Sequence, residues 1–242
     1  MTFQGDICII AGFSQIDHAE LAWRRNAARL KDMLELTEIH YKPATSGRAI
    51  LNGVSVRAQQ GRPLLISGES GSGKTSLLEI ISGMVGAQSG TIQWKGSNLN
   101  QRQRRWLCGV VFQFPERHFL GLSVGQELKL GHRRLAGDEQ TEVLSQVGLH
   151  GVDSRQAPER LSGGQQRRLA LAVQLLRKPE VLLLDEPTAG LDWSVRGEVL
   201  DLLYTLSRQR VLIVVTHEPD LFRGWNCEHR QLRDGQLLAL SP

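Results

Sequence analysis

The sequence predicts an α/β fold in which an open sheet carries a phosphate-binding loop. The first observation is Gly68–Thr75, which reads G-E-S-G-S-G-K-T and matches the G-x-x-x-x-G-K-[ST] phosphate loop. The second is its context: an apolar run at 63–67, typical of a buried strand, precedes it, and a helical pattern at 76–81 follows it. The third is that helical segments alternate with further apolar runs typical of buried strands, at 108–113, 181–186 and 211–216.

The composition fits one globular α/β domain with an inserted subdomain. The 242 residues include 29 Lys and Arg against 25 Asp and Glu, so the formal net charge is only +4. The basic residues are scattered, and no nucleic-acid partner is expected. The three cysteines form no C-x-x-C pair, which fits a reducing compartment and offers no zinc site. No apolar run reaches the roughly 18 residues that span a bilayer, so any membrane connection is expected to come through a partner.

Residues 1–32 are expected to be an extension in front of the folded domain at 33–242. Glu20–Leu30 could form a helix with a basic face, which would suit a membrane-surface or docking helix. We favour a disordered extension or an upstream start that is not used, because Met33 directly precedes the first regular strand pattern.

Three half-buried strand patterns surround the phosphate loop. Apolar and polar residues alternate from Leu34 to Tyr41 and again over Ile50–Ala58. Gly90–Trp94 is a third such pattern, and a turn is expected at Gly96–Asn98. These segments predict a small antiparallel β-layer beside the phosphate-loop unit.

Two other segments are classified by pattern alone. The basic run Arg102–Arg105 predicts a solvated helix face rather than a binding site. Near the carboxyl end, Arg230–Arg233 and Gln236–Leu240 predict a hairpin that turns at Asp234 and Gly235.

Residues 114–160 predict a mostly helical insertion between strands, and the helix after it carries this subdomain to about residue 178. Ser123 and Gln126 have capping-box spacing at the start of one helix. Asp138 is expected to cap a second helix that runs to about Val147.

The phosphate loop predicts a nucleotide site. Its glycines let successive N–H groups point at a phosphate, at the positive end of the following helix. Lys74 would neutralise β- and γ-phosphate charge, and the Thr75 hydroxyl would be a hard oxygen ligand for Mg²⁺. The alternative is a glycine-rich turn that binds nothing. The nucleotide-binding residues expected here are Gly68, Glu69, Ser70, Gly71, Ser72, Gly73, Lys74, Thr75 and Ser76.

A second anion-binding helix terminus is predicted at Ser162. This residue is a natural N-cap for the helix that follows, and Gly163 and Gly164 expose backbone N–H groups at the helix start.

Polar residues also end two of the apolar strands. Asp185 would hold Mg²⁺ through water opposite Thr75, and Glu186 is placed to accept a proton from an attacking water. His217 follows the strand at 211–216, where ligands gather in open α/β sheets. The alternatives are a charged turn at a strand end and a structural histidine.

Three motifs together resemble the ATPase domain of ATP-binding-cassette (ABC) proteins. They are the phosphate loop, LSGGQ at Leu161–Gln165, and LLLDEP at Leu182–Pro187. The resemblance covers roughly residues 33–242. It implies a P-loop NTPase fold with a RecA-like core, an antiparallel β-layer and an inserted helical subdomain at about 114–178. It also implies ATP and Mg²⁺ as cofactors.

The resemblance implies roles for individual residues. Tyr41 would stack on adenine, Gln113 would touch Mg²⁺ and the attacking water, and His217 would contact the γ-phosphate. Glu186 would be the catalytic base. Asp192 would be the acidic member of a loop that contacts the opposite subunit.

Domains of this family pair head to tail. Ser162, Gly163, Gly164 and Gln165 would therefore cap the ATP held by a second subunit. A single copy of each motif implies a homodimer or a related partner chain.

Phe112–Glu116 is similar to the same segment of energy-coupling-factor importer ATPases, which bring in cobalt, nickel or vitamins, and of related cyanobacterial and plastid ATPases. His118 and Phe119 depart from the polar residues of that group. The similarity implies a cytoplasmic chain held on the inner face of the cell membrane by integral membrane subunits. A coupling helix of such a subunit would meet the Gln113 region and the helices after it.

A soluble ABC ATPase of an assembly system, such as iron–sulfur cluster biogenesis, is the alternative function. A DNA-repair or chromosome-structuring ATPase is excluded, because those chains need a long coiled coil between the phosphate loop and the signature. Only 88 positions separate Lys74 from Ser162. A translation-factor ATPase would carry two cassettes, and this chain carries one.

Overall fold

The computed structural model describes residues 32–44, 47–132 and 134–239. The expectations for the amino-terminal extension therefore lie outside the described residues, except for Asp32. Within the described residues, no helix is long and apolar enough to cross a bilayer.

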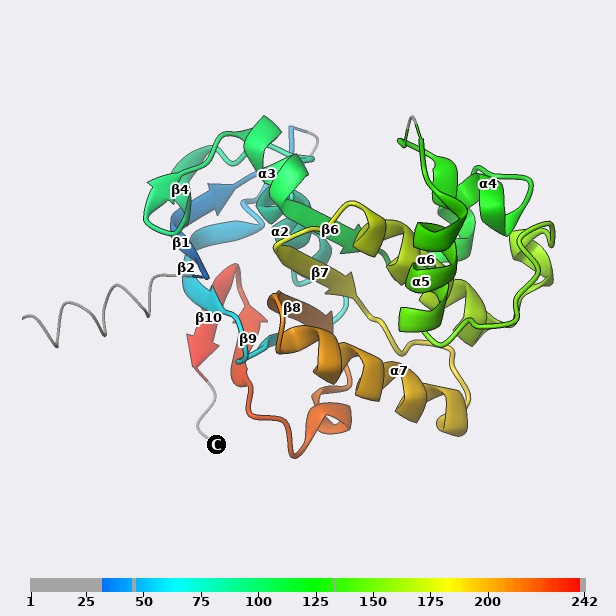
Figure 1. Ribbon diagram of the computed structural model, residues 1–242. Coiled ribbons are helices and arrows are strands. Elements are labelled where there is room, and N and C mark those ends of the chain that lie inside the picture. Colours follow the sequence, from blue (N-terminus) through cyan, green and yellow to red (C-terminus); the bar gives the residue numbers. More distant parts are fainter. Residues whose placement is uncertain (1–31, 45–46, 133, 240–242) are drawn as a thin grey trace, which may run out of the picture. The chain divides into compact units, whose positions relative to one another are not determined.

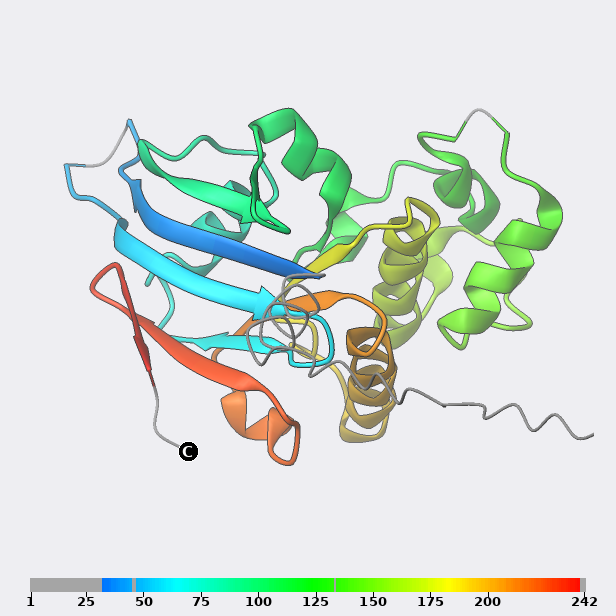
Figure 2. The same cartoon turned by 60° about the vertical axis from the view of Figure 1, so that its left-hand side comes forward.

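The predicted antiparallel β-layer is confirmed. It is a four-stranded sheet in the order β2-β1-β4-β5, and its long strands run beside one another in Figure 2. The turn expected at Gly96–Asn98 is wrong in part, because Ser97 and Asn98 pair with Trp94 and Gln93 as a short strand and leave the turn at Lys95 and Gly96. The strands are β1 (Met33–Tyr41), β2 (Leu51–Gln59), β4 (Ser89–Trp94) and β5 (Ser97–Asn98).

The second sheet has the order β10-β9-β3-β8-β7-β6. All of its neighbours pair in parallel except the carboxyl-terminal hairpin β9–β10, which is antiparallel as predicted. The strand expected at 108–113 ends two residues earlier, at Val111. The strands are β3 (Leu64–Ser67), β6 (Cys108–Val111), β7 (Val181–Asp185), β8 (Val211–Thr216), β9 (Glu228–Arg233) and β10 (Gln236–Ala239).

The parallel sheet separates two hydrophobic clusters. Successive side chains of a strand point to opposite faces, so Leu182 and Leu184 of β7 pack into one cluster while Val181 and Leu183 pack into the other. Both faces are covered, which explains why the central strands are continuously apolar.

The helical subdomain lies beside the parallel sheet, with α4 and α5 close to α6 (Figure 1). These helices are α4 (Val124–Lys129), α5 (Gly137–Gln146) and α6 (Gly163–Leu176). Half of the capping box expected from the spacing of Ser123 and Gln126 forms: the Ser123 hydroxyl accepts the Gln126 N–H at 3.3 Å, but the Gln126 side chain accepts the N–H of Leu122 at 2.9 Å rather than that of Ser123. The expectation that Asp138 caps α5 is wrong: the helix begins at Gly137, and the Glu139 carboxylate accepts the N–H of Ala136 instead.

Three other helices pack against the sheets: α2 (Lys74–Ile81), α3 (Gln101–Leu107) and α7 (Trp193–Ser207). The basic run at 102–105 does lie on a helix, but Arg104 is buried rather than solvated. No prediction covered α7. The i, i+4 and i+7 spacing of its buried Val199, Leu203 and Leu206 is the signal that could have found it. Short 3₁₀ turns complete the chain at η1 (Pro115–His118), η2 (Pro158–Arg160) and η3 (Pro219–Phe222).

Candidate active site

A cavity of about 550 Å³ lies at the carboxyl edge of the parallel sheet. Strands β3, β6, β7 and β8 run in parallel, so the residues that follow each of them meet at this edge, where ligands bind in open α/β sheets. Its lining comprises Ile50, Ser70, Gly71, Gly73, Lys74, Thr75, Ser76, Gln113, Asp185, Glu186 and His217.

The phosphate loop joins β3 to α2 and needs glycine at Gly73. This residue is the N-cap of α2 and has a left-handed φ of 101°. A Cβ there would lie 2.5 Å from Cγ2 of Ile50. Glycine therefore allows the loop to turn directly beneath the cavity and to present the amino end of α2 to it.

Lys74 is the first residue of α2, and its side chain folds back along the loop. Its Nζ donates to the carbonyl oxygens of Gly68 at 2.8 Å and Glu69 at 2.9 Å. The side chain is buried although it carries a charge. These hydrogen bonds hold the ammonium group inside the curve of the loop, where a phosphate would lie.

Thr75 and Asp185 are 110 positions apart in sequence but meet in the cavity. The Thr75 hydroxyl donates to Oδ2 of Asp185 at 2.7 Å. Burial raises the pKa of Asp185, the Thr75 hydrogen bond lowers it, and the neighbouring Glu186 carboxylate raises it again. A hydroxyl and a carboxylate this close form the oxygen pair that suits Mg²⁺, whose remaining ligands are usually water and substrate phosphates.

Glu186 and His217 form a pair at the ends of β7 and β8. Nδ1 of His217 lies 2.8 Å from Oε1 of Glu186. Glu186 is buried and has a left-handed φ of 47°, and its backbone N–H donates to Val215 at 2.9 Å. An ionised carboxylate only accepts, so Nδ1 of His217 carries the proton in this contact. Left-handed backbone at a non-glycine residue costs free energy and concentrates at functional sites.

Arg167 is the residue that the sequence analysis missed. It lies on α6 with only 4% of its surface exposed. Its guanidinium donates to three backbone carbonyls, Gln113 at 2.6 Å, Glu186 at 3.3 Å and Ala189 at 2.9 Å. Arg167 thus ties α6 to two segments that line the cavity. An arginine in a polar run is normally solvated, so no sequence signal marked it.

Other expected residues do not line this cavity. Tyr41 ends β1 opposite Leu51, beside the cavity-lining Ile50. Ser162 caps α6, where its hydroxyl accepts the Gln165 N–H at 3.3 Å, and its own N–H donates to the Gln165 side chain at 2.9 Å.

The signature glycines differ in surroundings. Gly163 is exposed, whereas Gly164 is buried, and a Cβ on Gly164 would lie 2.1 Å from Val195 of α7. Gly164 is therefore required by helix packing. Asp192 precedes α7 and is exposed; its side chain makes no capping hydrogen bond.

The chain is similar to proteins of one family over most of its length. The family model described as "ABC transporter" matches residues 51–189. The "ABC transporter I family member 11, chloroplastic" of Arabidopsis thaliana is 37% identical over 201 residues, which cover 76% of this chain and 72% of that protein. The "Energy-coupling factor transporter ATP-binding protein EcfA" of Methanococcus maripaludis is 30% identical over 218 residues, covering 85% and 78%.

A solved structure agrees with these relatives. The cbiO1 protein of Clostridium perfringens, described as part of the ABC transporter complex cbiONQ, superimposes with a TM-score of 0.75 at 27% identity. The match covers 85% of this chain and 86% of that one. The sheets, the inserted helices and the phosphate-loop cavity are thus those of a P-loop NTPase, and the chain belongs to the ABC transporter family as an ATP-binding and ATP-hydrolysing domain.

Proposed function

We propose that this chain is the ATPase subunit of an energy-coupling-factor type importer, for a metal ion or a vitamin. The observation that carries the proposal is the convergence of Lys74, Thr75, Gln113, Asp185 and Glu186 on one cavity. The names of the relatives support the importer class. In this reading the chain is cytoplasmic and is held on the inner face of the cell membrane by its partners.

The triphosphate of ATP would lie over the phosphate loop. Lys74 neutralises its charge, and the N–H groups at the start of α2 donate to its oxygens. Thr75, Asp185 and Gln113 supply the oxygen atoms that would hold Mg²⁺. Mg²⁺, when bound, spreads the negative charge that develops on the transferred phosphoryl group. Tyr41, near the rim, would stack on the adenine.

Glu186 is the proposed general base. Its carboxylate accepts a proton from a water that attacks the γ-phosphorus in line, while the bond to the β–γ bridging oxygen breaks. The contact with His217 at 2.8 Å fixes the orientation of this carboxylate beforehand. His217 lines the same cavity and would contact the γ-phosphate.

The cavity would be one half of the working site. Ser162 and Gly163 are exposed at the amino end of α6 and do not line it, so they are available to the ATP held by a second ABC ATPase subunit. Gln165 stabilises this helix end through its hydrogen bond with Ser162, and Gly164 lets the helix pack closely against α7. Asp192, exposed at the start of α7, would contact the same partner. ATP binding would close the pair, and hydrolysis would reopen it.

An apolar loop provides a docking surface for the integral membrane subunits. Leu120 and Leu122 are 80% and 82% exposed between η1 and α4. The buried carboxylate of Glu127 accepts the N–H groups of Leu120 at 2.9 Å and Gly121 at 2.7 Å. These hydrogen bonds fix the backbone that carries the two leucines, so little conformational entropy is lost when a partner docks there. The segment also follows Gln113 closely in sequence.

Trapping with Glu186→Gln tests the catalytic half of the proposal. The substitution keeps the shape of the side chain but removes the proton acceptor. ATP should still bind, turnover should fall by about 100-fold or more, and a dimer should accumulate in size-exclusion chromatography. Rapid turnover in this variant would refute the assignment of Glu186 as the base.

Co-purification tests the transporter half. The tagged chain is recovered from detergent-solubilised membranes of its own cell, and the integral membrane proteins that accompany it are identified. The double variant Leu120→Asp, Leu122→Asp should lose them while still binding ATP. Leu238→Asp, at an exposed leucine of β10, is the matched control. Recovery with soluble cysteine-rich proteins alone would favour the assembly-factor alternative and contradict the proposal.

A further inference from the structure

A second cavity, of about 640 Å³, lies at the opposite edge of the parallel sheet. Lys178, Pro179 and Glu180 directly precede β7, and Gln209 and Arg210 directly precede β8. The nucleotide cavity lies at the other ends of the same strands, and the two share no lining residue. Nothing in the proposed ATPase cycle uses this second cavity.

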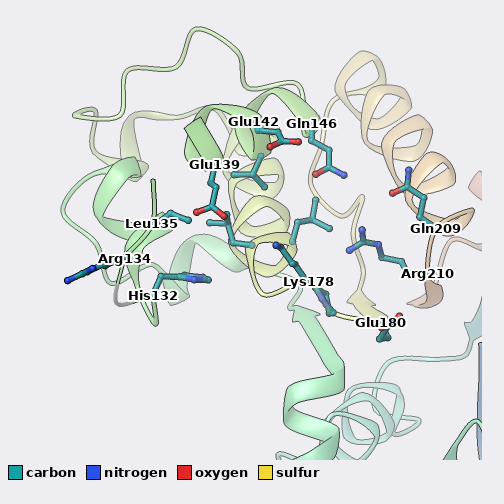
Figure 3. Close-up of a pocket in the computed structure, with 14 residues that line it drawn as sticks. His132, Arg134, Leu135, Glu139, Glu142, Gln146, Lys178, Glu180, Gln209 and Arg210 are labelled. Carbon is teal, nitrogen blue, oxygen red and sulfur yellow. The ribbon is translucent and has the colours of Figure 1, made fainter. Parts of the chain in front are cut away.

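Arg210 points into this cavity (Figure 3), and two of its nitrogen donors are unpaired within the part of the chain that the structure describes. Its Nε and Nη1 atoms are buried and have no hydrogen-bond partner among the described residues. Burial lowers the pKa of the guanidinium, and the Glu180 charge only partly opposes this effect. Buried donors are almost always paired in folded proteins, so these two donors are available to an anionic group bound in the cavity.

Lys178 reaches into the cavity beside Arg210, as Figure 3 shows. Its backbone is left-handed, with a φ of 51°, immediately before Pro179. Glycine or asparagine is usual at such a position after a helix. No described residue forms an ion pair with Lys178 or Arg210. Two cations thus converge at the sheet edge, and the nearby Glu180, whose charge acts on Arg210, forms no ion pair with either of them within the described residues. The backbone of Lys178 is in a conformation that is unfavourable for a residue other than glycine.

The opposite wall presents two carboxylates to the cavity, although His132 and Arg134 also line it. In Figure 3, Arg134 points away from Lys178 and Arg210. Glu139 and Glu142 extend from α5 toward the cavity, together with Gln146. Their spacing puts all three on one face of the helix. Within the described ranges, no salt bridge crosses from this wall to the cations. Between the walls, the floor is apolar and includes Val143, Leu175 and Leu176.

The charges that line the cavity, as well as its volume, limit which ligands it can bind. A polyphosphate would be attracted to one wall and repelled by the other. A ligand with one anionic end, an apolar middle and one cationic end complements all three surfaces. A volume of 640 Å³ is in the range of small-ligand sites.

We propose that this cavity binds a small organic zwitterion, an ω-amino carboxylate, with its carboxylate on Arg210 and Lys178 and its ammonium facing Glu139 and Glu142. The methylene chain between the two charged groups lies over the apolar floor. Because α5 belongs to the helical subdomain and Arg210 precedes a core strand, the ligand bridges the two.

A chain-length series tests the proposal on the full-length protein without nucleotide. Isothermal titration measures binding of ω-amino carboxylates from β-alanine to 6-aminohexanoate and of lysine. Affinity is expected to peak at one length, and the same alkyl carboxylate without the amine should bind at least about tenfold more weakly. Added ATP should leave this affinity unchanged, because the nucleotide cavity is at the other end of the strands.

Variants assign the binding to this cavity. Arg210→Gln and Glu142→Gln should each weaken binding by about tenfold or more. Glu142 is exposed, so this second variant remains informative if Arg210→Gln folds poorly. Arg208→Gln, two positions from Arg210 and exposed beside the Tyr204 ring, is the control. Absence of binding by the whole series, equal affinity for the amine-free carboxylate, or unchanged affinity in both variants would overturn the proposal.

Discussion

Replacing Arg167 by glutamine should separate ATP turnover from ATP binding. Arg167 is 4% exposed, and its guanidinium donates to the backbone carbonyls of Gln113, Glu186 and Ala189. Glutamine is too short to reach all three and carries no charge. The segments bearing Gln113 and Glu186 would therefore lose their common anchor, while the phosphate loop would keep its own hydrogen bonds.

The magnitude follows from the contacts. Two of the hydrogen bonds are short, at 2.6 and 2.9 Å, and the third, at 3.3 Å, is weaker. A hydrogen bond to a charged group contributes about 1.5–3 kcal/mol, so loss of the two short ones costs at least about 3 kcal/mol. At about 2–4 °C per kcal/mol, Tm should fall by roughly 10 °C. Displacement of catalytic groups by about 1 Å can cost 10²-fold in rate.

Steady-state ATPase assays well below the lowered Tm measure this effect. We expect kcat to fall by about 100-fold while KM for ATP changes little. Arg167→Lys, which keeps the charge but not the fork of donors, should recover part of the rate. Arg155→Gln, at a side chain that is 93% exposed, is the matched control. If Tm falls but kcat per folded molecule is unchanged, Arg167 only stabilises the fold and the positioning role is refuted.

Three further predictions concern other residues. Ser162→Arg should abolish turnover and leave ATP binding to the single subunit intact, because the exposed end of α6 would contact the nucleotide bound by the partner subunit. Normal turnover in this variant would refute the proposal that two subunits share each site. Asp185→Asn should raise Tm at neutral pH while removing Mg²⁺-dependent hydrolysis. The folded-state pKa of Asp185 is raised, so the stability of the wild-type protein falls as pH rises from about 4 through that pKa. The plot of Tm against pH should therefore be flatter for the variant, and identical plots for the two proteins would contradict the prediction. Burial raises the pKa of Cys108 to about 12, so at pH 8 its thiol should react with a disulfide reagent only as fast as the protein unfolds. Rapid labelling that is absent from Cys108→Ala would contradict its burial.

Most of the fold could be predicted because its signals are local. Continuous apolar runs predicted β7 and β8, whose side chains are buried on both faces. Alternation predicted β1 and β2. Two of the errors were also local: Glu139 competes with Asp138 for the start of α5, and Ser97 and Asn98 pair with β4 instead of forming a turn. The burial of Arg104 is an effect of packing.

The residues of the candidate site also fall into two groups, those whose geometry is local in sequence and those that the sheet brings together. Gly73, Lys74 and Thr75 are recognisable from sequence because strand, loop and helix are contiguous, so their spacing alone specifies their geometry. The meeting of Thr75 with Asp185, and of Glu186 with His217, depends on the order of parallel strands. Their positions at strand ends, together with the motif resemblance, predicted these residues as parts of one site, but only the sheet brings their atoms within 2.8 Å.

The amino-acid sequence by itself determined the phosphate loop, most of the strands and helices and the family, since each depends on residues close together in the chain. Only the tertiary structure decided the burial of Arg167, the convergence of Lys178 and Arg210, and the two carboxylates that face them. An arginine has the same local pattern whether its guanidinium lies in water or against three carbonyls. What distinguishes the two is desolvation by residues from distant segments, and packing alone creates that environment.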